Sequence, residues 1–146
     1  MRIAPAELSA LRARGAAPAV SSWRDGVLTL AVPGVLKNPL NQRWFYHTRA
    51  RWSRTWHEKT AATLLEAGFR RAQSNPSVPR LVHFHGYVQR LFDSDGLQAA
   101  LKPCRDALVV YGVLNDDAER AGHLFEYSQE TSAGWRGVVV TVTARS

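Results

Sequence analysis

Residues 80–91 constrain the fold more than any other part of the chain. Polar and apolar side chains alternate along this stretch, with Val82, Phe84 and Val88 on one side and His83, His85 and Tyr87 on the other. A period of two is the pattern of a β-strand whose two faces meet different surroundings. The chain therefore contains a sheet, and its apolar face needs a covering layer.

Five further segments complete the predicted fold. Residues 26–32, 123–129 and 135–143 have strand patterns, and the last two form a predicted hairpin across residues 131–134. Residues 50–67 and 97–110 have the apolar spacing of helices. We predict an α+β (or α/β) domain in the order β-α-β-α-β-β. It would have a single mixed β-sheet of about four strands and two main helices packed on it.

Length and composition place the chain in a broad class. The 146 residues predict one domain over residues 23–146, preceded by a flexible or short-helical lead-in over residues 1–22. No apolar run approaches the ~18 residues that cross a bilayer, and charged side chains interrupt the region where a signal peptide would lie. Cys104 is the single cysteine, which excludes an internal disulfide. We expect a cytoplasmic protein without a membrane partner.

The charge balance indicates a polyanionic partner. Nineteen Lys and Arg residues stand against twelve Asp and Glu residues, a formal net charge of +7. This excess favours nucleic acid as the partner. Arginines outnumber lysines by 16 to 3, which suits bidentate contacts with phosphate, although a GC-rich genome gives the same bias.

The negative charge is concentrated in one short segment. Five of the six aspartates lie between positions 93 and 117, namely Asp93, Asp95, Asp106, Asp116 and Asp117. They either serve turns and helix caps or converge to hold a cation. Carboxylate oxygens suit Mg²⁺, or Mn²⁺, so these five residues are the candidate metal ligands.

The spacing of these residues allows such a site. In an extended chain Asp93 and Asp95 project to the same side, and Lys102 lies two helical turns beyond Asp95. With the turn that holds Asp117, they would form a metal-dependent phosphodiesterase site in which Lys102, Asp95 and Asp117 are the candidate catalytic residues. The alternative is structural, with Asp95 as a helix N-cap and Lys102–Asp106 as a surface ion pair.

The same residues resemble a family motif. In order, the chain has Asp93-Ser94-Asp95-Gly96-Leu97, Lys102, Asp106-Ala107-Leu108, Gly112-Val113-Leu114 and Asp116-Asp117. This run of about 25 residues is similar to the RusA family of Holliday-junction resolvases. Two positions depart from the family pattern: Gly96 stands where an Asn is usual, and Lys102 comes three residues later than in the shortest family spacing.

The resemblance implies a function. It implies a RusA-like endonuclease domain that nicks branched DNA, such as a four-way junction, with Mg²⁺ and as a homodimer in a bacterial or phage-infected cell. It also implies metal ligation by Asp93, Asp95 and Asp117 and an essential role for Lys102, with Asp106 part of the motif. Two alternatives stay open: a DNA- or RNA-binding module without catalysis, and a nuclease directed at single strands or RNA.

A basic and aromatic stretch supplies candidate DNA contacts. Residues 26–57 contain no acidic side chain and carry Lys37, Arg43, Arg49, Arg51 and Arg54. Aromatic residues interleave with them, which suits phosphate contacts combined with stacking on unpaired bases. A tryptophan pair four apart on a helix, Trp52 and Trp56, is also typical of a buried core.

The histidines give a weaker signal. His83 and His85 share one predicted strand face, with His123 as a possible third member of a zinc site. Polar surface explains the same pattern. A straight strand would also keep His85 about 26 Å from Asp93, so the histidines would not join the aspartates.

Overall fold

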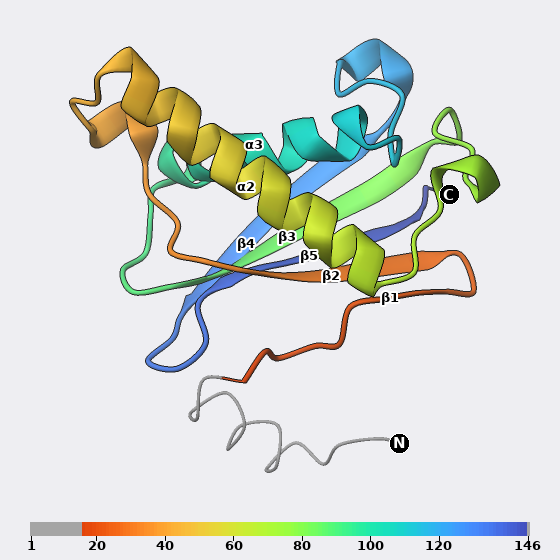
Figure 1. Ribbon diagram of the computed structural model, residues 1–146, viewed down its shortest axis with the longest axis horizontal. Coiled ribbons are helices and arrows are strands. Elements are labelled where there is room, and N and C mark those ends of the chain that lie inside the picture. Colours follow the sequence, from red (N-terminus) through yellow and green to blue (C-terminus); the bar gives the residue numbers. More distant parts are fainter. Residues whose placement is uncertain (1–15, 146) are drawn as a thin grey trace.

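A five-stranded sheet with two long helices on one of its faces forms the body of the protein (Figure 1). The computed structural model describes residues 16–145. The strands are β1 (Ser22–Arg24), β2 (Val27–Pro33), β3 (Arg80–Val88), β4 (Leu124–Thr131) and β5 (Gly137–Ala144). The helices are α2 (Tyr46–Glu66) and α3 (Ser94–Val110), with short 3-10 turns η1 (Pro39–Asn41), η2 (Arg71–Gln73) and η3 (Glu119–Ala121).

The sheet is mixed, with the strand order β1-β2-β5-β3-β4. β3 and β4 run parallel and the other neighbours run antiparallel. This confirms the α+β class, the single mixed sheet and the two main helices. A fifth strand, β1, pairs with β2 across a tight turn in which Asp25 and Gly26 both have positive φ, 52° and 77°.

The predicted hairpin between the last two strands is wrong. β3 lies between β4 and β5 and pairs with both of them, so β4 is an edge strand and β5 is central. The burial of side chains explains this arrangement. Val138, Val140 and Val142 of β5 are all buried, whereas β4 exposes Glu126, as suits an edge strand.

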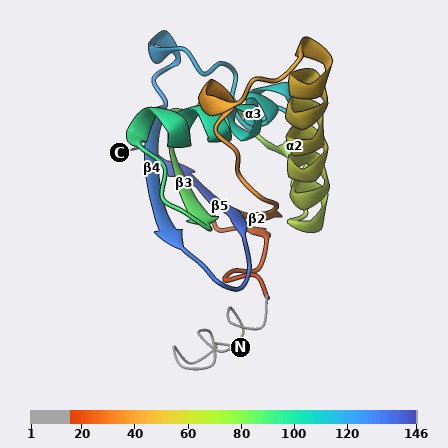
Figure 2. The same cartoon turned by 90° about the vertical axis from the view of Figure 1, so that its left-hand side faces the viewer.

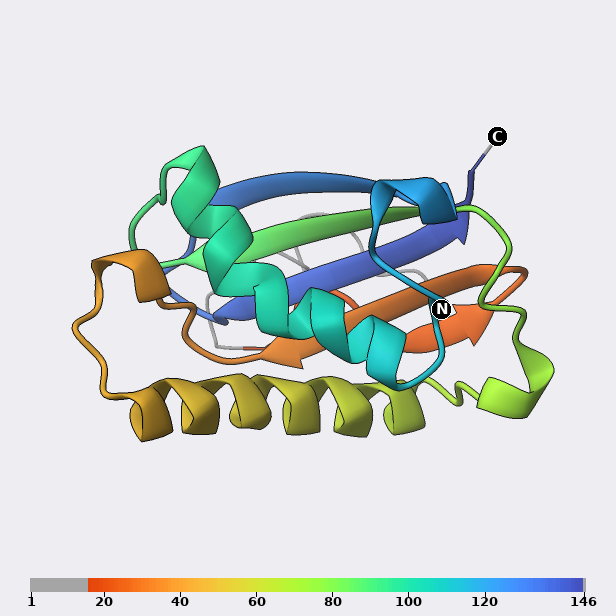
Figure 3. The ribbon, with the colours of Figure 1, turned by 90° about the horizontal axis from the view of Figure 1, so that it is seen from above.

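Both helices cover the same face of the sheet (Figures 2 and 3). The core between the layers combines Leu30, Phe84 and Val140 of the sheet with Leu101 and Leu108 of α3, all fully buried. Trp56 and Leu64 extend this core from α2. Each such large side chain contributes about 1.5–3 kcal/mol by leaving water. The predicted strand of residues 80–91 is confirmed over residues 80–88, where Val82, Phe84 and Val88 are buried and the intervening histidines are not, and it ends three residues early.

The helix boundaries differ from the predicted ones. α2 begins at Tyr46, four residues before the predicted start, after Phe45, which makes no side-chain capping bond. α3 begins at Ser94, because the Asp93 side chain caps it by accepting from the Gly96 N–H. Asp93 is therefore the N-cap, and the alternative that Asp95 takes this role is wrong.

Two expectations concern the ends of the chain and membranes. Residues 1–15 of the predicted lead-in lie outside the described residues, and β1 begins at Ser22, the last residue of that lead-in. Within residues 16–145, neither helix combines the length and the apolar character that crossing a bilayer needs.

Candidate active site

The aspartates of the acidic segment occupy the start of α3, its exposed face and the turn after it. Asp93 caps the helix with a 2.7 Å bond from the Gly96 N–H to its Oδ1, and Asp95 lies exposed in the first turn. The expectation that Asp93 and Asp95 project together from an extended chain is wrong, because the cap turns the backbone into a helix between them. Asp95 instead shares a helix face with Lys102, about 10 Å further along the axis.

Lys102 contacts one aspartate and shares a cavity with another. Its Nζ is 3.3 Å from Asp106 Oδ1, one helical turn away. It also lines an open cavity of about 290 Å³ together with Gln98, Arg105, Asp117 and Tyr127. The structure therefore brings an ammonium group and a carboxylate from two separate segments to one cavity.

Arg105 holds the Asp117 end of this cavity in place. Its Nη2 donates to the Asp117 backbone carbonyl (2.8 Å) and its Nη1 to the Tyr127 hydroxyl (3.1 Å). The guanidinium also stacks over the Phe125 ring, 3.7 Å from the centroid. The Arg105 Nε lies 3.3 Å from Asp117 Oδ2 but forms no aligned hydrogen bond. The Asp117 carboxylate therefore forms an ion pair with Arg105.

Asp116 points to different partners. Its Oδ1 accepts from the Ala118 N–H (3.1 Å), and its Oδ2 lies 3.2 Å from Arg120 Nη2. The bond from Ala118, followed by the Arg120 cation, lowers the pKa of the Asp116 carboxyl below its ordinary value. Asp116 therefore stabilises the turn that contains Asp117.

His123 ties this turn to the sheet. Its Nδ1 accepts from the Arg80 N–H (3.1 Å), and its Nε2 donates to Asn115 Oδ1 (2.8 Å), two residues before Asp117. This arrangement uses the neutral ring with its proton on Nε2. Burial, followed by the Arg80 cation, lowers the pKa of His123.

The predicted site residues are only partly gathered. Within residues 16–145, no three His, Cys, Asp or Glu side chains lie together in a way that would hold a metal ion. Lys102 and Asp117 line the cavity and Asp106 contacts Lys102, while Asp93 and Asp95 lie at the start of α3. Mg²⁺ commonly uses one or two carboxylates, several waters and substrate phosphates, so the hard oxygen donors beside Lys102 suit it without a full protein cage.

Gly96 has an unexpected neighbour. A Cβ at this position would lie 2.6 Å from Asp93 Oδ1 and 2.7 Å from the side-chain nitrogen of Asn38. Asn38 is buried and accepts from the Leu40 N–H. The Asn38 amide therefore fills the space that a side chain at position 96 would need, beside the cap of α3.

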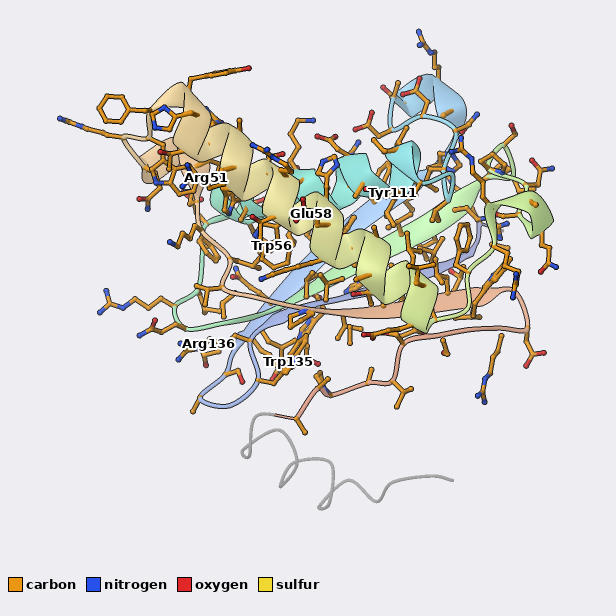
Figure 4. All side chains as sticks on the ribbon, viewed as in Figure 1. Arg51, Trp56, Glu58, Tyr111, Trp135 and Arg136 are labelled. Carbon is orange, nitrogen blue, oxygen red and sulfur yellow. The ribbon has the colours of Figure 1, made fainter. Side chains whose placement is uncertain are left out.

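The five predicted DNA contacts are all exposed to solvent. Lys37, Arg43, Arg49, Arg51 and Arg54 lie on or just before the N-terminal half of α2. Lys37 and Arg51 line a groove of about 330 Å³ with Trp44, Trp52 and Trp56. Figure 4 shows Arg51 and Trp56 on this half of α2. Trp56 is only 2% exposed and belongs to the core, as the apolar spacing indicates.

The histidine pair lies on the opposite face of the sheet from the helices. His83 Nε2 and His85 Nδ1 both lie 2.6 Å from the Ser128 Oγ. Their other ring nitrogens face carboxylates, His83 toward Glu126 (3.4 Å) and His85 toward Glu130 (2.9 Å). His123 lies elsewhere, in the contacts with Arg80 and Asn115 described above. Because each ring nitrogen of His83 and His85 has a protein partner, the pair is explained as part of the polar surface of the sheet.

Three side chains around the candidate site are not predicted from the sequence. Arg105, Tyr127 and Asn38 position the site through contacts between distant segments. Only Arg105 has a local signal, because it lies three residues after Lys102 and borders the same helix face. Comparison of the chain with protein-family models gave no match, and comparison with curated proteins gave none.

Proposed function

We propose that the protein is a Mg²⁺-dependent endonuclease that nicks branched DNA, such as a four-way junction, and acts as a homodimer. One observation carries the proposal: Lys102 and Asp117 line a single cavity, and Arg105 fixes the backbone at Asp117. The motif resemblance and the net charge of +7 support nucleic acid as the substrate. A two-fold dimer would present two such sites to the two strands that must be cut.

The roles of the residues follow from their positions. Lys102 lines the cavity together with Arg105 and would stabilise negative charge that develops on the phosphate in the transition state. Asp117 would hold the metal, with waters and substrate phosphate as further ligands. Asp106 contacts Lys102, whereas Asp93, Asp95 and Asp116 would need to move to reach the same ion. A bound Mg²⁺ would polarise the phosphate and lower the pKa of water. Exposed Arg43, Arg49 and Arg54, with Lys37 and Arg51, would hold the flanking phosphates.

The proposal predicts that Asp117→Asn abolishes nicking. We expect the wild type to nick a labelled four-way junction with Mg²⁺ and not with EDTA, and the variant to be slower by at least about a hundredfold. Asp25→Asn is the matched control, because Asp25 is the one aspartate outside the acidic segment and lies in the β1–β2 turn. Nicking that survives EDTA, or that Asp117→Asn leaves unchanged, contradicts the proposed site.

A second candidate function is DNA or RNA binding without catalysis. The dispersal of the carboxylates, with no three of them gathered among residues 16–145, favours it. It predicts salt-sensitive binding and no nicking with Mg²⁺ or Mn²⁺. Comparing junction, flap, duplex, single-stranded and RNA substrates in the same assay separates this function, and a nuclease directed at single strands or RNA, from junction cleavage.

A further inference from the structure

The groove on the N-terminal half of α2 combines aromatic and cationic side chains. Trp44, Trp52 and Trp56 line it together with Lys37, Arg51 and Lys59, and none of its lining residues is acidic. Its volume of about 330 Å³ lies in the range of small-ligand pockets. We propose that this groove binds one unpaired nucleotide of a DNA strand. The ring would stack on tryptophan, and Lys37 and Arg51 would contact the adjoining phosphates.

The tryptophans are arranged as a fixed platform. The rings of Trp44 and Trp52 lie 5.2 Å apart at an angle of 57°, so one ring supports the other. Trp56 is anchored in the core, and Lys59 lies over it, 5.2 Å from the ring centroid. Gly34 allows this close packing, because a Cβ there would lie within 3 Å of both Lys59 and Trp56.

The core explanation covers only part of this groove. It accounts for Trp56, which is nearly fully buried, but Trp44 and Trp52 are only partly buried. Lys37 and Arg51 are exposed at the rim of the groove, so packing of the core does not explain why they are there. Bases stack on aromatic side chains whatever their sequence, and phosphates pair with cations.

The groove adjoins the acidic segment. Lys37 in its wall precedes Asn38, whose amide packs against Gly96 at the start of α3. The wall of the groove is therefore linked through residues 37 and 38 to the helix end that carries Asp93 and Asp95. The inference rests on the proposed function for its ligand, and it adds that unpaired bases, rather than duplex alone, are recognised.

Binding in EDTA tests the inference without any cleavage. The probes are a fluorescein-labelled blunt duplex and the same duplex with a single-stranded thymidine overhang. We expect Trp44→Ala to weaken binding of the overhang DNA by about 5- to 150-fold and to leave the blunt duplex nearly unchanged. The control is Trp135→Ala, because Trp135 lies away from α2 in the β4–β5 connection (Figure 4).

The salt dependence gives an independent readout. Arg51→Gln should reduce the slope of log K against log salt for the overhang DNA by about 0.7, whereas Arg24→Gln in β1 should not change it. Unchanged overhang binding by Trp44→Ala, or an equal loss for both DNAs, overturns the inference. Because these measurements need no metal, they stay informative if the protein proves not to nick DNA.

Discussion

Gly96 and Asn38 show how closely a single site is packed. The position has no room for a methyl group, since a Cβ would approach Asp93 Oδ1 and the Asn38 nitrogen to 2.6 and 2.7 Å. We predict that Gly96→Ala lowers the free energy of unfolding by about 1–3 kcal/mol, because the alanine must displace the helix cap or the buried amide. Urea unfolding followed by circular dichroism measures this change.

A second variant separates crowding from other effects at position 96. Asn38→Ala removes one of the two crowding groups, so adding it to Gly96→Ala should cost less than the sum of the two single changes. Additive losses in this double-mutant cycle would show that Asn38 does not occupy the space beside Gly96.

His123 makes stability depend on pH. Because burial and the Arg80 cation lower its pKa, the unfolded chain binds a proton more readily than the folded protein does. The stability that His123 contributes is therefore present above about pH 6.5 and is lost as the pH falls below that value toward the lowered folded-state pKa. Unfolding free energies measured between pH 5 and 8 should show this fall.

The control for the pH prediction is another histidine. His123→Gln should flatten the fall below pH 6.5, whereas His47→Gln should not, because His47 is exposed. If both variants keep the wild-type pH profile, the contacts of His123 with Arg80 and Asn115 do not govern this dependence.

At the scale of elements, the packing of α2 on α3 protects the single cysteine. Cys104 of α3 is fully buried, 3.8 Å from the Thr60 hydroxyl of α2, and burial raises the pKa of its thiol to about 12. We predict that a thiol reagent at pH 8 modifies the native protein at least about a hundredfold more slowly than the urea-unfolded chain. Comparable rates would mean that the two helices separate readily.

A helix or strand can be predicted from the sequence where its own apolar spacing determines which of its side chains are buried. The alternation around Phe84 predicts β3, and the repeat of Leu97, Leu101, Cys104 and Leu108 predicts most of α3. The partner of a strand is set by distant segments instead, and this is why the short 131–134 link gives a false hairpin. The valine-rich segment 138–142 of β5, by contrast, is typical of a central strand.

The candidate site, like the fold, can be predicted from the sequence only where local pattern determines it. Residue types and order give the acidic segment and Lys102, whereas the direction of each side chain depends on its contacts. The hydrogen bond that caps α3 at Asp93 starts the helix there, so the side chains of Asp93 and Asp95 do not project to the same side as an extended chain would have them. The roles of Arg105, Tyr127 and His123 come from pairing α3 and the following turn with β3 and β4, which no local spacing encodes.

For the whole molecule, the two faces of the sheet have different characters. The helix-covered face carries the basic groove and the acidic segment side by side, joined through Asn38 and Gly96. The opposite face carries His83 and His85 between the carboxylates of Glu126 and Glu130. The groove gathers Lys37, Arg51 and Lys59 on the helix side, so we expect DNA to lie there.

Iron-directed cleavage of the protein tests the central claim, a divalent cation beside Lys102 and Asp117, most directly. Fe²⁺ with ascorbate replaces Mg²⁺ and cuts the backbone near the bound ion, and mass spectrometry locates the cuts. We predict cuts around residues 95–106 and 115–118 that excess Mg²⁺ suppresses and that Asp117→Asn removes. Cuts confined to β3 and β4 near His83 and His85, or no cuts at all, would contradict the account.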